Sequence, residues 1–184
     1  MSLRSKDLKE LDPLSKAFGR LFLERHPDWA EFAWIETEEG FEEEPPHLVV
    51  QLTHSSGDGY VLEISTEGGE VMVSMRFWHA HSSMLTEGGE DTEAEALAAL
   101  QLAERLWAGN ARPWARFKAG EWMGSGLLER TEDPEALAAD LADDERLTIV
   151  SFDGLGDQTF GNGPAPEDVE SEEADEQAEA GADS

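Results

Sequence analysis

Apolar and polar residues alternate along much of the segment between His47 and His81. A period of two is typical of strands that bury one face, so we expect strands over residues 47–54, 60–65 and 70–81. Turns rich in glycine separate these segments, which together predict an antiparallel meander. In the third strand the shared face would carry Val71, Val73, Met75 and Phe77, followed by His79 and His81 at its rim.

Two segments show the spacing of an amphipathic helix. Asp12 followed by Pro13 is a typical helix start, and the apolar positions that follow predict a helix over residues 13–26. A second helix is expected over residues 93–108, because Thr92 and Glu95 match a capping box and Gly109 follows the last apolar position.

The remaining segments are shorter. We expect a short buried segment and then an exposed loop over residues 28–46, strands over 113–118, 122–128 and 147–152, and a small helix from Pro134 to about Leu141. The fold class that these elements predict is α+β: one antiparallel sheet of about five or six strands, with two main helices packed on one face.

The chain of 184 residues is long enough for one domain with a real core. We expect a single α+β domain over residues 1–162. From Gly163 to Ser184 the composition is acidic and lacks any apolar period, so this segment is predicted to be a disordered tail.

Composition excludes several classes of protein. The chain has no cysteine, which rules out disulfides, thiolate metal sites and cysteine nucleophiles. No apolar run approaches the roughly 20 residues that span a bilayer, and the first residues have mixed charge without a continuous hydrophobic segment and a small-residue cleavage site, so we expect a soluble, cytoplasmic protein.

The net charge is −29. Residues 1–30 carry +1 and residues 163–184 carry −9, which leaves −21 for residues 31–162. Such a charge repels phosphate backbones and anionic lipid, so we expect no nucleic-acid or membrane partner, whereas a basic protein partner would be attracted. The alternative is that the acidity serves solubility alone.

His79 and His81 are candidate metal ligands, because alternate residues of a strand lie on one side of it. His54, at the end of a neighbouring strand, or a carboxylate such as Glu63 could supply a third ligand for a divalent transition metal. The alternative is that these histidines only pack and donate hydrogen bonds, so that no cofactor is bound.

An aromatic and glycine-rich hairpin follows the second helix. Trp114, Arg116 and Trp122, together with Trp78, are candidate partner-binding residues, because Trp and Arg are frequent at interface hot spots. Alternatively, Trp114 and Trp122 form a cross-strand pair, and Gly124 and Gly126 permit a bend or a close backbone approach.

Specific catalytic motifs are absent. Gly124-Ser125-Gly126 is not followed by the helix start that a hydrolase nucleophile elbow requires, and no phosphate-binding loop is present. The carboxylates are too numerous to single out an acid–base pair.

Two motifs carry a resemblance. Phe77-Trp78-His79-Ala80-His81, before the second helix, and Lys118-Ala119-Gly120-Glu121-Trp122-Met123-Gly124-Ser125, after it, make residues 47–128 resemble small uncharacterised bacterial α+β proteins. The resemblance implies no particular activity. In general character such acidic domains are also similar to bacterial immunity and partner-binding proteins.

The function expected from the sequence is therefore that of a non-enzymatic interaction protein, which masks a basic partner as an immunity protein does. The alternative is a metal-dependent hydrolase that uses His79 and His81. A third reading, a small-molecule binding module built on the Trp-rich hairpin, predicts an enclosed apolar pocket.

Overall fold

A computed structural model of the protein describes residues 3–37, 45–54, 59–86 and 91–165. Most of the predicted tail and the turn at residues 55–58 lie outside these ranges. The described chain is α+β and its strands pair antiparallel, which confirms the predicted class.

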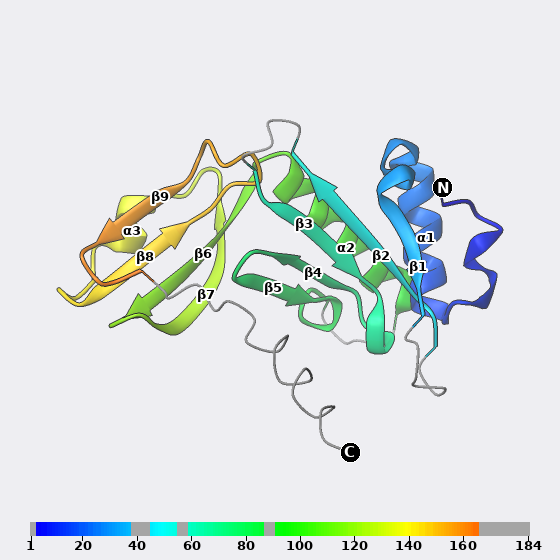
Figure 1. Cartoon of the computed structure of the whole chain (residues 1–184), viewed down its shortest axis with the longest axis horizontal. Coiled ribbons are helices and arrows are strands. Elements are labelled where there is room, and N and C mark those ends of the chain that lie inside the picture. Colours follow the sequence, from blue (N-terminus) through cyan, green and yellow to red (C-terminus); the bar gives the residue numbers. More distant parts are fainter. Residues whose placement is uncertain (1–2, 38–44, 55–58, 87–90, 166–184) are drawn as a thin grey trace, which may run out of the picture.

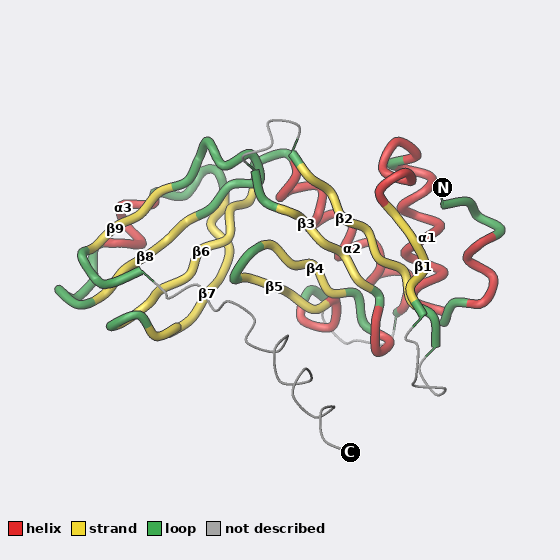
Figure 2. Tube along the Cα trace, viewed as in Figure 1, coloured by secondary structure: helices red, strands yellow, loops and turns green. Residues whose placement is uncertain are grey.

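The strands form two sheets and not one (Figure 1). The first sheet has the order β1-β2-β3-β4-β5, with β1 at Ala33–Glu36, β2 at His47–Thr53, β3 at Val61–Ser65, β4 at Met72–Met75 and β5 at Trp78–His81. The second has the order β7-β6-β8-β9, with β6 at Ala111–Lys118, β7 at Glu121–Glu129, β8 at Glu145–Ile149 and β9 at Gln158–Gly161. In Figure 2 the strands of the two sheets lie in separate groups, β6 to β9 on the left and β1 to β5 toward the right.

Helices α1 (Pro13–Arg25) and α2 (Thr92–Trp107) cover one face of the first sheet, as predicted. α3 (Pro134–Ala138) packs on the second sheet, and 3₁₀ turns cover Asp7–Glu10, Pro27–Phe32, Glu67–Gly69 and Ser82–Met84. The Asp12 N-cap is confirmed, because its carboxylate accepts hydrogen bonds from the backbone of Leu14 and Ser15. The capping box is wrong: Asp91 caps α2, and the buried Glu95 instead accepts from the Ser82 hydroxyl.

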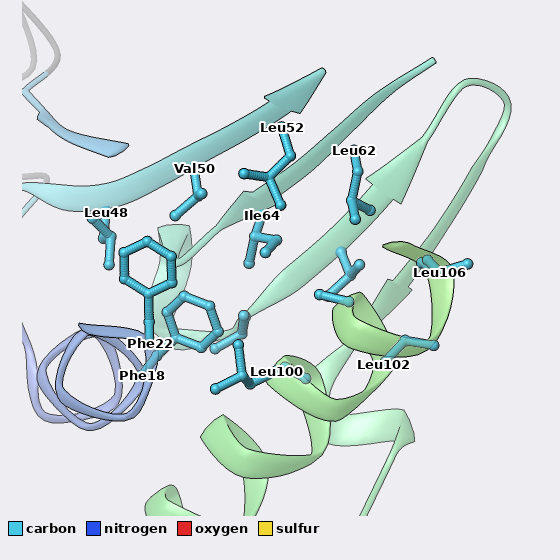
Figure 3. Close-up of a cluster of buried hydrophobic side chains, with 14 of the residues drawn as sticks. Phe18, Phe22, Leu48, Val50, Leu52, Leu62, Ile64, Leu100, Leu102 and Leu106 are labelled. Carbon is cyan, nitrogen blue, oxygen red and sulfur yellow. The ribbon is translucent and has the colours of Figure 1, made fainter. Parts of the chain in front are cut away.

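The main core lies between the first sheet and its two helices (Figure 3). Phe18 and Phe22 stack with ring centroids 6.1 Å apart, on the side where Leu48 and Val50 point down from the sheet. The largest fully buried side chains here include Leu52, Leu62, Ile64, Leu100 and Leu106. Burial of these groups is the dominant stabilising contribution.

The predicted strand over residues 70–81 is wrong, because a turn at Arg76-Phe77 divides it into β4 and β5. Met75 lies opposite Trp78, and Arg76 has a φ of +56°, a left-handed conformation that suits a tight hairpin. The turn changes which alternate positions are buried: Val71, Val73 and Met75 before it, Trp78 and Ala80 after it. His79 and His81 therefore lie on the face opposite the valines, not on the same face as predicted.

The second sheet has a small core of its own and is joined to the main one. Leu128, Leu147 and Ile149 pack with residues of α3, whereas Val150 and Phe152, which follow β8, are buried in the main core. The Phe152 ring lies 4.6 Å from that of Trp107, and its carbonyl accepts from the Tyr60 backbone N–H. Two strands, β1 and β9, were not predicted, and the last predicted strand ends at Ile149.

Candidate functional site

The face of the first sheet opposite α1 and α2 is not covered by either of these helices. We call it the open face. The alternation of each strand assigns to it Trp34, Glu36, His47, Val49, Gln51, Thr53, Val61, Glu63, Ser65, Met72, Ser74, His79 and His81. Leu48, Val50 and Leu52 point the other way, into the helices (Figure 3).

Strand register arranges these side chains in cross-strand rows. One row runs from Trp34 through Val49, Ser65 and Met72 to His81, and the next from Gln51 through Glu63 and Ser74 to His79. Side chains directly opposite on neighbouring strands lie close enough to act together. The rows cross all five strands, although the side chains of Val49 and Ser65 within them are buried, at 4% and 5% exposed.

Charge on this surface has one sign. None of the five strands contains a lysine or arginine, whereas Glu36 and Glu63 lie on the open face and Glu70, just before β4, borders it. Glu63 accepts a hydrogen bond of 2.6 Å from the Gln51 amide. The surface therefore offers carboxylate oxygens with no cationic side chain of the same strands beside them.

His79 and His81 are brought together, with ring centroids 5.2 Å apart and planes nearly perpendicular. His81 Nδ1 lies 2.8 Å from Glu70 Oε2, and the Ser83 hydroxyl donates to the other oxygen of Glu70. The two histidines therefore form the β5 edge of the open face, where His81 contacts Glu70.

His54 does not lie beside this pair. It follows β2, which β3 and β4 separate from β5, and its ring packs edge-on against Phe152 at 5.6 Å. Glu63 is separated from His79 by the strand that carries Ser74. Over residues 3–37, 45–54, 59–86 and 91–165, no three His, Asp or Glu side chains form a group that could hold a metal ion.

The predicted partner-binding residues are scattered. Trp78 is only 5% exposed and packs in the main core. Trp114 is half-buried beneath α3 and lies over Gly126, where a Cβ would stand 2.9 Å from the indole. The group that approaches Gly126 is thus an indole and not another backbone. The Trp114–Trp122 pair is wrong, because Trp122 lies opposite Phe117 and is 59% exposed.

Arg116 is engaged within the second sheet. Its guanidinium pairs with the Glu145 carboxylate and donates to the Asp140 carbonyl at 3.0 Å. The hydrogen bond from the Ala142 backbone N–H stabilises the Glu145 carboxylate and so lowers its pKa, and the hydrogen bond from Arg116 has the next largest effect in the same direction. This arginine holds the segment between α3 and β8 to the sheet.

Trp34 is the open-face residue that the sequence analysis missed. It lies in a segment predicted to be buried, yet the structure leaves it 40% exposed at the β1 edge. The alternation of Ala33, Trp34, Ile35 and Glu36 contains the signal, but four residues are too few to establish a period.

No family model matches this chain, and neither a curated protein nor a solved structure does. Among the described helices, none is both long and apolar enough to cross a membrane.

Proposed function

We propose that the protein is a non-enzymatic interaction protein that binds a basic protein partner through its open face. The observation that carries this proposal is the composition of that face: five adjacent strands without lysine or arginine, acids at Glu36, Glu63 and Glu70, and an exposed Trp34. A surface of this composition matches a partner rich in lysine and arginine.

Two kinds of contact support the match. Carboxylates such as Glu63 accept charge-assisted hydrogen bonds from lysine and arginine. The Trp34 ring can receive a cation on its face, an interaction worth about 0.5–2 kcal/mol. Trp34 also lies at one end of a row that includes Met72, and large amphipathic rings are frequent anchors of interfaces.

The charge of the whole chain would act before contact. A net charge of −29 attracts a basic protein over about a Debye length, roughly 8–10 Å at physiological salt, and raises the association rate. Masking of a basic partner in the manner of a bacterial immunity protein, in the cytoplasm, is the specific form of this proposal.

The test compares two matched variants in a pull-down from native lysate, run at low and high salt. Trp34→Ala/Glu63→Gln removes an aromatic ring and an acid from the open face. Trp122→Ala/Glu121→Gln removes the same two groups from an exposed position on the second sheet. Retained proteins are identified by mass spectrometry, and the affinity of a basic one is then measured with purified components.

We expect wild type to retain a basic protein at low salt and to release it at high salt. The open-face variant should weaken this binding by about 30-fold or more, the cost of losing a hot-spot residue, and the second-sheet variant should bind like wild type. If no basic protein is retained in a salt-sensitive way, the proposed function is wrong. If only the second-sheet variant loses binding, the partner uses the Trp-rich hairpin and not the open face.

A further inference from the structure

A pocket of about 340 Å³ lies between the β4–β5 turn and the second sheet. Phe77, in the turn, meets Phe117 of β6 edge-on with ring centroids 6.0 Å apart, which fixes the turn against that sheet. The polar residues that line the pocket are Arg76, Arg146, Thr148, Asp157, Gln158 and Thr159. Its volume is in the range of small-ligand sites.

One wall belongs to strands β8 and β9. Arg146 and Thr148 are two residues apart on β8 and so share a side, and Thr148 pairs directly with Thr159 of β9. The side chains of Leu147 and Phe160 pack with α3, on the other face of this sheet. The wall therefore presents one guanidinium and two hydroxyl groups to the pocket.

Arg76 on the opposing wall is held in a fixed position. Its guanidinium lies 5.0 Å from the centre of the Tyr60 ring and 5.7 Å from that of Phe77, and Nη1 donates to the Tyr60 hydroxyl at 2.6 Å. The residue has a positive φ, which costs free energy for a side chain other than glycine. Such conformations persist where the surroundings enforce them, and they cluster at functional sites.

The positive charge of the pocket is only partly balanced. Neither Arg76 nor Arg146 makes an ion pair with any residue in the described ranges. Arg146 Nε is buried and has no hydrogen-bond partner there either. A buried polar group without a partner is costly, and its charge favours an anion nearby.

The charged side chains that line the pocket sum to a net charge of about +1, from Arg76, Arg146 and Asp157. Burial is the main cause that raises the pKa of Tyr60, and the hydrogen bond to Asp157 raises it further, so the hydroxyl stays neutral. Asp157 is the one carboxylate among the described lining residues; it accepts from Tyr60 at 2.5 Å and from the Ser151 backbone at 2.8 Å. Two cations and one anion in the lining suit a ligand with a single negative charge.

We infer that this pocket binds the carboxylate group of a small molecule. The planar guanidinium of Arg146 matches the two oxygens of a carboxylate, and the hydroxyls of Thr148 and Thr159 can donate to them. The Phe77 ring offers an apolar surface for the rest of the ligand. A phosphate dianion would carry one charge too many for the lining.

The test is a titration of the full-length protein with benzoate, followed by calorimetry and by the NMR signals of arginine Nε–H groups. Benzamide, which has the same shape and no charge, and inorganic phosphate are the comparison probes. We expect saturable binding of benzoate and at least tenfold weaker binding of the other two, as expected when a charged hydrogen-bonding group is lost. Equal binding of benzamide, tighter binding of phosphate, or no binding of benzoate would overturn the inference.

Variants locate the site. Arg146→Leu should weaken benzoate binding at least tenfold. Thr148→Val, a near-isosteric change on the same wall, should also weaken it. Arg130→Leu removes an exposed arginine outside the pocket lining and should leave the affinity unchanged. Unchanged binding in both pocket variants, with native circular dichroism, would contradict the assignment.

A further variant distinguishes the source of the carboxylate. The described chain reaches the pocket at Ala165, and nine acidic residues follow it in the sequence. We expect Glu167→Gln/Asp168→Asn to bind benzoate as wild type does, which assigns the site to a separate small molecule. A gain in benzoate affinity would instead assign it to carboxylates of the same chain, and a loss would contradict both.

Discussion

Ser82 links the two ends of the β4–β5 hairpin to α2, and its replacement tests whether buried hydrogen bonds hold the open face in place. The Ser82 hydroxyl is fully buried, accepts from the Val71 backbone N–H at 3.1 Å and donates to Glu95 Oε2 at 3.1 Å. Ser82→Ala removes both bonds. It leaves the backbone bond of 2.8 Å from Ser82 N to the Val71 carbonyl in place.

The magnitude follows from the two partners left behind. A buried N–H without an acceptor costs about 1–3 kcal/mol, and loss of a hydrogen bond to a charged group costs about 1.5–3 kcal/mol. Because the loop can relax around the smaller side chain and recover part of this, we expect a total loss of about 2–4 kcal/mol. That is a large part of the roughly 5–15 kcal/mol that holds a domain folded.

Urea unfolding followed by tryptophan fluorescence measures this change. The midpoint should fall by about 1–2 M with an unchanged slope. Ser83→Ala is the matched control: this neighbouring serine is exposed and its one bond goes to Glu70, so about 0.5 kcal/mol or less is expected. If Ser82→Ala costs no more than Ser83→Ala, the buried hydroxyl does not stabilise the hairpin and the reasoning fails.

Three further predictions concern the helix start, acid stability and cooperativity. Asp91→Ala should cost about 1 kcal/mol in urea unfolding, because its carboxylate accepts from the backbone of Glu93 and Ala94 at 3.0 and 3.2 Å, whereas Thr92→Ala should be nearly neutral; the reverse order would restore the capping box. The pKa of Glu145 lies below its ordinary value of 4.5, so its stabilising contribution is present above pH 4.5 and is lost as the pH falls through the lower folded value. Glu145→Gln should therefore flatten the fall in unfolding free energy below pH 4.5, and an unchanged slope would show that the carboxylate is not stabilised. Because Val150 and Phe152 join the second sheet to the main core, unfolding followed by fluorescence and by far-ultraviolet circular dichroism should give one coincident transition; two transitions would assign a separate domain to each sheet.

Local signals in the sequence were enough to predict the helices and the strands that glycine-rich turns separate. Asp12-Pro13 starts α1 at the predicted residue, since a cap and a proline act on their own backbone. The β4–β5 hairpin was missed because Arg76 and Phe77 are not typical turn residues. The contacts that hold Arg76 in its conformation come from Tyr60 and Phe77 and from the sheet beyond, and only the folded chain brings them together.

In the candidate site, too, local features could be predicted from the sequence and features that depend on the pairing of distant segments could not. The adjacency of His79 and His81 follows from strand alternation, and it holds even though the predicted face was wrong. The exposure of Trp34 and the meeting of Arg76 with Arg146 depend on which strands pair and on how two sheets meet. The four residues of β1 are too few to establish the period that exposes Trp34, and no local pattern records how two sheets meet.

The two-residue turn at Arg76-Phe77 sets the register of β5 against β4, and this register decides which side chains of β5 face solvent. Met75 and Trp78 are partners across that turn, and every later position of β5 inherits its side of the sheet from this pairing. A single residue inserted before Trp78, with the two-residue turn kept, would shift the pairing of β5 with β4 by one position, turn Trp78 and Ala80 outward and bring both imidazoles against hydrocarbon. Homologous chains in which β5 is shifted by one residue against β4 would therefore present an indole to solvent where this one presents two histidines.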